Sequence, residues 1–184
     1  MSKDAEVDDV LVQRASRGDP AAFVELATRW WTPVYRFSRN MLGSACEAAE
    51  ATEQVLQFAV RFPEAVGCNL PFGMSLYGVA VDFTFLRCPS ARRSPTEPSR
   101  GPDLAETIRG MLQRLEFLDR AAFVLREVEQ LSVEETVATL RIPAAEVRAR
   151  THRATLALTR MRAPTVPRSG SGMPDAFDDG CSQA

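Results

Sequence analysis

The sequence has little of what a metal protein or an enzyme needs. Of its 184 residues one is a histidine and four are cysteines. The cysteines, at positions 46, 68, 88 and 181, form no Cys-x-x-Cys pair, and His152 has no metal-binding partner nearby in the sequence. A glycine-rich phosphate loop, a nucleophile elbow and a paired His/Glu motif are also missing. We therefore expect no metal, no cofactor, no catalytic residue and no small-molecule substrate.

Long hydrophobic runs are missing as well. The N-terminus, "MSKDAEVDDV", is acidic where a secretion signal would be basic and then apolar. The longest apolar run, around Val79–Leu86, is interrupted by Asp82. The basic segment "EVRARTHRATLAL" lacks the aromatic anchors of a helix that lies on a membrane. These features predict a cytoplasmic protein with no membrane partner.

Lysine is nearly absent, and the arginines are unevenly distributed. Lys3 is the one lysine among 22 basic residues, and the net charge is −2. Residues 1–86 hold 7 basic and 11 acidic side chains, whereas residues 146–162 hold 5 basic and 1 acidic. A negative total is unfavourable for binding nucleic acid through phosphate contacts alone. The positive charge is instead concentrated on one C-terminal segment.

Proline-rich and polar stretches divide the chain. The segment "CPSARRSPTEPSRGP", residues 88–102, carries four prolines and almost no apolar side chain, so it cannot continue a helix. Residues 163–184 lack any periodicity and are expected to be a disordered tail. Elsewhere apolar residues recur at helical spacing and not in alternation. The sequence therefore predicts an all-α protein, with two small helical domains at 1–87 and 103–162 joined by a flexible linker at 88–102.

The N-terminal domain is expected to contain four helices. Gly18-Asp19-Pro20 should end the first helix and cap the second. The apolar face of the second helix is predicted to comprise Phe23, Leu26, Trp30, Val34, Phe37 and Met41. In the third, Val55, Phe58, Ala59 and Phe62 should point inward, leaving an acidic side whose simplest interpretation is a solvated face. The fourth should bury Phe72, Leu76, Val79 and Phe83.

The C-terminal domain has the pattern of a helix-turn-helix. A helix over Leu104–Leu115 is expected to bury Leu104, Ile108, Met111, Leu112 and Leu115, and the next should start near Asp119. Ser132 and Glu135 have the spacing of a capping box for a short helix that ends near Leu140. After a break at 141–143, Ala144 opens a longer, basic helix whose Val147, Ala154 and Leu158 can pack inward. Many helical hairpins share this pattern, so a basic but merely solvated face remains the alternative.

Two segments carry a resemblance to a known family. "LVQRASRGDPAAFVELATRW" resembles the start of sigma region 2, and "LEFLDRAAFVLREVEQLSVEETVATLRIPAAEVRARTHRATLAL" resembles sigma region 4. Together they make the chain similar, over roughly residues 8–162, to the extracytoplasmic-function group of sigma factors of bacterial RNA polymerase. The segments "FVLREVEQLS" and "VRARTHRA" are specific in combination.

The resemblance implies partners and site residues. Region 4 would place the last helix in the major groove of promoter DNA, with Arg148 and Arg150 projecting from its exposed face; the implied DNA-binding residues are Ala145, Arg148, Ala149, Arg150 and Arg153. Region 2 would dock on core RNA polymerase through an acidic and amide pattern, which falls on Glu47, Glu50, Glu53 and Gln54. The resemblance further implies an anti-sigma factor as a partner.

The sequence departs from the family pattern in two places. Ser75 stands where tryptophan is usual, Gly78 and Val81 stand where arginines are usual, and Asp82 replaces asparagine, so cations that would hold a DNA strand are missing. Arg141 replaces the glycine of the helix-turn-helix at an expected left-handed position, at a cost of about 1 kcal/mol. Two hypotheses stay open: an alternative sigma factor, or a sigma-like adaptor or decoy that binds protein partners without opening promoters.

Overall fold

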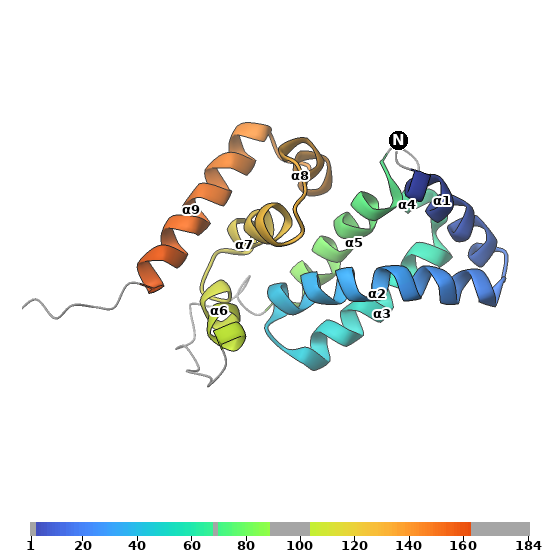
Figure 1. The fold of residues 1–184 in the computed structure, drawn as a ribbon, viewed down its shortest axis with the longest axis horizontal. Helices are drawn as coiled ribbons and strands as arrows, with labels where there is room; N and C mark the ends of the chain where they lie inside the picture. The colour runs from blue at the N-terminus through green and yellow to red at the C-terminus, as the bar shows by residue number, and fades with distance from the viewer. Residues whose placement is uncertain (1–2, 68–69, 89–103, 163–184) are drawn as a thin grey trace, which may run out of the picture.

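The computed structural model describes residues 3–67, 70–88 and 104–162. Within these ranges the elements are helices and no strand occurs, which confirms the all-α prediction. The N-terminal half contains α1 (Lys3–Ser16), α2 (Pro20–Leu42), α3 (Ala45–Arg61), α4 (Pro63–Gly67) and α5 (Phe72–Arg87) (Figure 1). The C-terminal half contains α6 (Leu104–Leu112), α7 (Phe117–Phe123), a π-helical turn (Val124–Val128), α8 (Val133–Leu140) and α9 (Ala144–Arg162). The predicted linker beyond Cys88 and the predicted tail lie outside the described residues.

The turn between α1 and α2 forms as its sequence predicts. Gly18 adopts a φ of 89°, which glycine reaches without a Cβ clash. The carboxylate of Asp19 accepts hydrogen bonds from the backbone N–H groups of Ala21 and Ala22, at 3.0 and 3.3 Å. Pro20 occupies the first helical position, where no N–H is needed. This cap fixes where the long helix α2 begins.

Helices α1, α2, α3 and α5 pack around a common apolar core. Leu26, Val34, Phe37 and Met41 of the predicted α2 face are fully buried, and Phe23 and Trp30 pack at its edge. The prediction for Phe62 is wrong: its side chain is 40% exposed. Because α3 ends at Arg61, the backbone of Phe62 has left the helical conformation, and its ring lies against that of Phe58 at 5.0 Å.

The C-terminal half differs from the prediction at its first helix. Leu104 and Ile108 are 74% and 46% exposed, contrary to the expected buried stripe. Leu112 is buried as expected, but α6 ends there, so the buried Leu115 lies beyond the helix. Helix α7 begins at Phe117, close to the expected Asp119. The short α8 and the longer α9 have the predicted boundaries.

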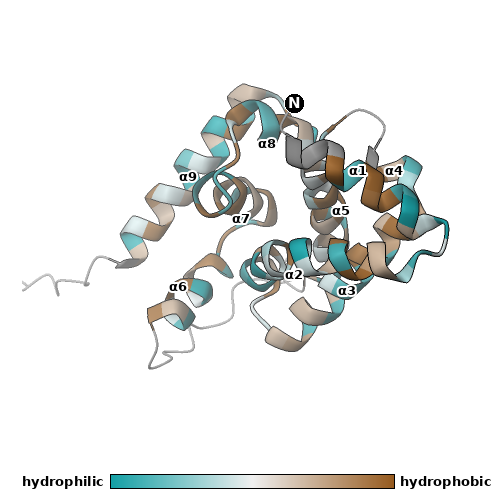
Figure 2. Cartoon of the chain, turned by 45° about the vertical axis from the view of Figure 1, so that its right-hand side comes forward, coloured by the Kyte–Doolittle hydropathy of each residue, from teal (hydrophilic) through white to brown (hydrophobic). Residues whose placement is uncertain are grey.

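The two halves pack against each other. Helix α5 contacts α8, and α2 contacts the π-helical turn, α6 and α7. Figures 1 and 2 both show α7 and α8 beside α2 and α5, with α9 on the side away from the N-terminal half. Side chains from both halves join one buried apolar cluster. We call this contact between the halves the seam.

Candidate nucleic-acid interface

The helix-turn-helix is fixed by hydrogen bonds at both ends of α8. The backbone N–H of Ser132 donates to Glu135 Oε2 at 2.7 Å, and the N–H of Glu135 donates to Ser132 Oγ at 3.1 Å, which is the predicted capping box. At the other end, Arg141 has φ 56° and ψ 37°, the left-handed conformation that the sequence predicts. Its N–H donates to the carbonyl of Val137 at 2.8 Å. The left-handed conformation of Arg141 therefore ends α8 three residues before α9 begins.

The inner side of α9 packs on α7. Val147 and Ala154 are fully buried and Leu158 is partly buried, as predicted. Beside them, Arg150 donates to Glu146 Oε1 from Nε at 2.9 Å and from Nη2 at 2.7 Å, and to Asp119 Oδ1 from Nη1 at 3.0 Å. Arg153 also binds Asp119, from Nε to Oδ2 and from Nη2 to Oδ1, both at 2.8 Å. One nearly buried carboxylate on α7 thus holds two arginines of α9.

These ion pairs decide what the two arginines can do. The side chain of Arg150 is 13% exposed, so the expectation that it projects from the open face of α9 is wrong. Burial of Arg150 disfavours its charge, but hydrogen bonds to Glu146 and Asp119 outweigh that effect and raise its pKa. The pKa of Arg153 is raised by Asp119, although this side chain remains 58% exposed. Both stay cationic, and both are already paired.

The outer side of α9 carries a different set of side chains, which are exposed to solvent. Ala145, Arg148 and Ala149 are exposed, and the described residues provide no ion pair for Arg148. His152 is exposed on the same stripe, at the helical spacing of three and four residues from these positions. Sequence reasoning did not select His152, although that spacing could have indicated it. In Figure 2 hydrophilic and hydrophobic residues mix along α9, in keeping with one packed and one open side.

The acidic residues of α3 form a second exposed face. Glu47, Glu50, Glu53 and Gln54 are all exposed, while Ala48, Ala51, Thr52 and Val55 on the other side are buried. The amide oxygen of Gln54 accepts from Arg87 Nη2 at 2.6 Å, which ties this face to α5. Glu53 accepts from the amide of Gln57 at 2.9 Å. The side is polar, negative and open.

The positions on α5 that lack the family's arginines are largely covered. Val81 is 8% exposed, and Gly78 lies beside α8, where a Cβ would be 3.7 Å from the carbonyl oxygen of Thr139. Ser75 is partly buried, while Asp82 is exposed. Of these four departures, Ser75 and Gly78 lie at the seam, beside Ala138 and Thr139 of α8.

The comparisons with known proteins agree with this geometry. Residues 105–158, which run from α6 through most of α9, match the family model "Sigma-70, region 4". The chain is also 22% identical over 174 residues to the ECF RNA polymerase sigma factor SigW of Bacillus subtilis (strain 168), covering 81% of this chain and 93% of that protein. The chain is thus similar to an extracytoplasmic-function sigma factor over most of its length, and to sigma region 4 over residues 105–158. Sigma factors are not a class of enzymes, and similarity to one favours the sigma factor hypothesis over the decoy.

Two solved structures share the fold of this chain. CnrH, solved in complex with the cytosolic domain of CnrY, is 19% identical, with a TM-score of 0.66 over 84% of this chain and 96% of that one. The sigma factor RpoE of Bartonella quintana, solved in complex with the anti-sigma factor NepR, is 14% identical, with a TM-score of 0.62 over 76% and 95% of the two chains. Among the described residues of this chain, no helix has the length and apolarity required to cross a membrane.

Proposed function

We propose that this chain binds core RNA polymerase in the cytoplasm, directs it to promoters and starts transcription there. The observation that carries the proposal is the open face of α9, which follows a properly capped α8 and a left-handed turn inside the segment that matches sigma region 4. A helix presented in this way can enter the major groove with its N-terminal residues against base edges. The chain acts as a binding subunit and supplies no chemistry of its own.

The proposed DNA contacts divide into two classes. Ala145, Arg148 and Ala149 face outward and would touch DNA directly, because small side chains let the backbone approach and arginine can bind guanine or clamp a phosphate. Arg150 and Arg153 are held by Asp119, so they would mainly position α9 and add positive potential near the groove. Exposed Arg153 can reach a phosphate while it keeps its ion pair.

The acidic side of α3 would dock on the polymerase. Glu47, Glu50, Glu53 and Gln54 present carboxylates and an amide to a basic partner surface. Few free cations on α9 imply weak DNA binding by the isolated chain, since each phosphate contact contributes to affinity. Attachment to a large polymerase would supply the missing affinity, which is consistent with the net charge of −2. An anti-sigma factor would then control the free protein.

Run-off transcription tests the proposal. Purified chain and core polymerase are incubated with a library of promoters, and transcripts are compared with those from core polymerase alone. We expect discrete transcripts that disappear in a Glu47→Lys/Glu50→Lys variant and persist in a Glu25→Lys control, which alters an exposed acid on α2. Binding to polymerase without any transcript would instead favour the adaptor.

A further inference from the structure

The outer side of α9 combines unpaired charge with exposed apolar surface. Four exposed side chains follow one another at intervals of four residues and form one ridge along the helix, which we call the outer row: Arg148, His152, Leu156 and Arg160. Leu156 is 42% exposed, and among the described residues neither arginine of the row forms an ion pair. A single exposed leucine is ordinary on a protein surface. Its place between two unpaired cations suits a ligand that carries both apolar and acidic groups.

The chain itself contains a segment of that complementary kind. Residues 163–184 lie outside the described residues, and their sequence includes "MPDAFDDG" at 173–180. Phe177 has Asp175 before it and two aspartates directly after it. A segment of this composition can bind an exposed surface without a core of its own. An aromatic ring among carboxylates thus matches a leucine among arginines.

The spacing of the two sets agrees. Positions four residues apart on an α-helix lie about 6 Å apart along its axis, and positions two residues apart in an extended chain lie about 7 Å apart. In a segment that runs back along α9, the ring of Phe177 can therefore lie on Leu156. Asp175 then lies beside Arg160, and the two later aspartates lie toward Arg148.

The covalent connection is long enough for this arrangement. Phe177 comes fifteen residues after Arg162, where α9 ends, and a stretch of that length can span up to about 50 Å. Leu156 lies only about 9 Å before the end of the helix, measured along its axis. The connection therefore holds the segment near the outer row at an effective concentration on the order of millimolar.

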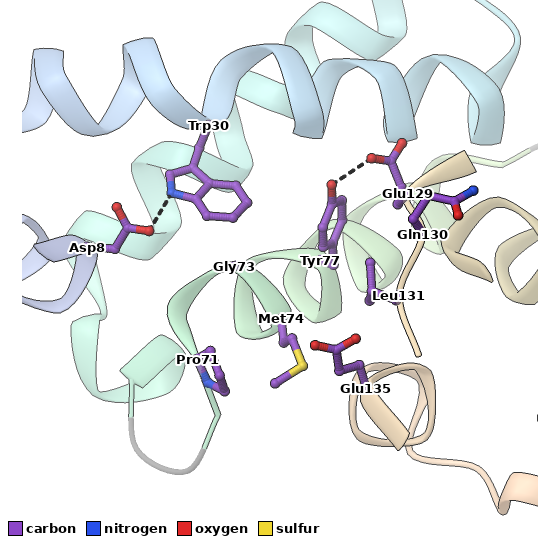
Figure 3. Close-up of a pocket in the computed structure, with 10 residues that line it drawn as sticks. All are labelled: Asp8, Trp30, Pro71, Gly73, Met74, Tyr77, Glu129, Gln130, Leu131 and Glu135. Carbon is purple, nitrogen blue, oxygen red and sulfur yellow. Dashed lines mark hydrogen bonds between the residues drawn. The ribbon is translucent and has the colours of Figure 1, made fainter. Parts of the chain in front are cut away.

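Charge argues against the other open surfaces. The exposed side of α3 is acidic. A groove between the two halves is lined by the carboxylates of Asp8, Glu129 and Glu135, and no basic side chain is among its described lining residues (Figure 3). In this groove the Tyr77 hydroxyl donates to Glu129 at 2.8 Å. Because like charges placed together are unfavourable, an acidic segment suits α9 better than either of these surfaces.

We propose that residues 173–180 bind the outer row of α9 within the same chain and there compete with DNA. The competition rests on the proposed function, because Arg148 is also the proposed DNA contact; the binding of the segment does not. The contact is electrostatic at its ends and apolar at its centre, so it weakens as the salt concentration rises. In the free chain the segment occupies the DNA-binding side, and DNA must displace it.

Paramagnetic relaxation in the full-length chain, with no partner present, tests the contact. A nitroxide on Cys181 follows the acidic segment directly in the sequence and broadens the signals of backbone amides that lie near it. Cys46→Ser and Cys68→Ser remove two other thiols, and the buried Cys88 is protected from labelling under native conditions. The position of the nitroxide therefore reports the position of the segment.

We expect the nitroxide to broaden the amide signals of Arg148 and His152 at low salt, and this broadening to fall several-fold in Asp178→Asn/Asp179→Asn carrying the same label. Amides at the end of α9 broaden in both chains through the connection alone and serve as the reference. Equal broadening of Arg148 in the two chains overturns the proposal. Broadening in an isotope-labelled chain without nitroxide, mixed with nitroxide-labelled chain, assigns the contact to a second copy and also overturns it.

Fluorescence anisotropy with a random-sequence DNA duplex, again without polymerase, tests the competition. Asp178→Asn/Asp179→Asn is compared with Glu25→Gln/Glu127→Gln, which removes two acids at exposed positions outside α9. The two variants have the same net charge, so general attraction to DNA is matched. We expect several-fold tighter binding by the first variant, and equal affinities overturn the competition. The relaxation result does not depend on transcription, so it stands or fails separately from the proposed function.

Discussion

At the scale of single residues, Arg141 shows how the turn is built. It adopts a left-handed backbone that glycine reaches without a penalty, and its N–H still closes the end of α8. Its side chain is exposed, so nothing in the packing requires arginine there. The residue therefore carries a local strain that the rest of the helix-turn-helix tolerates.

Arg141→Gly should raise the free energy of unfolding by about 0.5–1 kcal/mol, because the left-handed strain disappears. The measurement is urea unfolding followed by circular dichroism. As a matched control, Arg148→Gly in the interior of α9 should lower the same quantity by about 1 kcal/mol. Equal effects of the two substitutions would contradict this account of the turn.

Arg148 is the arginine whose removal should affect DNA most directly. If the Arg148 side chain contacts a base, Arg148→Ala should weaken binding of the upstream promoter element by about 1–3 kcal/mol. If it contacts a phosphate, the substitution should weaken binding evenly across DNA sequences. Arg160→Ala, on the same helix but twelve residues further along, should change binding little. Fluorescence anisotropy of the polymerase holoenzyme on promoter DNA checks both variants, and both should keep wild-type thermal stability.

At the scale of elements, α9 is divided into a structural side and an open side. The sequence predicted the helix, its start and its buried residues, because caps and apolar spacing are local. The sequence could not predict which arginines form ion pairs, since their partner Asp119 lies 34 residues before Arg153. Arg150 lies three residues after buried Val147 and four before buried Ala154, on the packed side of α9, whereas Arg148 is exposed; the partner that pairs Arg150, Asp119, is supplied by the fold.

Other elements show the same limit. Helix α4 is too short for a periodic pattern, and the sequence did not predict it. The exposed Leu104 and Ile108 match an apolar stripe, but their burial depends on how α6 sits against the N-terminal half. Four helices of the N-terminal half and the helix-turn-helix were predictable; the seam was not, because its contacts join residues far apart in the sequence.

Asp119→Ala should lower the free energy of unfolding by about 2–3 kcal/mol. The change removes a nearly buried carboxylate. The largely buried positive charge of Arg150 then loses one of its ion-pair partners, which is costly away from water. Arg153→Ala should cost less than about 1 kcal/mol, because that side chain is largely exposed. Urea unfolding of the two variants checks that Asp119→Ala loses more stability than Arg153→Ala. Equal losses would show that the burial of Asp119 does not add to the cost of removing it.

At the scale of the whole molecule, the seam sets how the two halves respond to pH. Burial and the neighbouring Glu129 raise the pKa of the Tyr77 hydroxyl above its ordinary value of 10.0. The folded state therefore keeps the phenol proton at pH values where the unfolded chain has lost it. This contribution to stability is complete below pH 10 and declines as the pH rises above that value.

Tyr77→Phe should remove this dependence. The free energy of unfolding of the wild type should fall as the pH rises above about 10, and that of Tyr77→Phe should fall less. At pH 7 the variant should be about 1 kcal/mol less stable, because the hydrogen bond to Glu129 is lost. Tyr35→Phe, which replaces the other tyrosine, serves as the control and should follow the wild type.

The seam joins two parts of one chain, so any opening of it would be unimolecular and would not change with protein concentration. The covalent connection holds α8 near α5 at an effective concentration on the order of millimolar. A partner that competes for α5 must overcome that local concentration, and a weak ligand present at micromolar levels would not do so. A large partner can bind both halves at separate surfaces, the acidic side of α3 and the helix-turn-helix. Once its first contact has formed, its second contact is also intramolecular, so this partner can compete with the local concentration of α8.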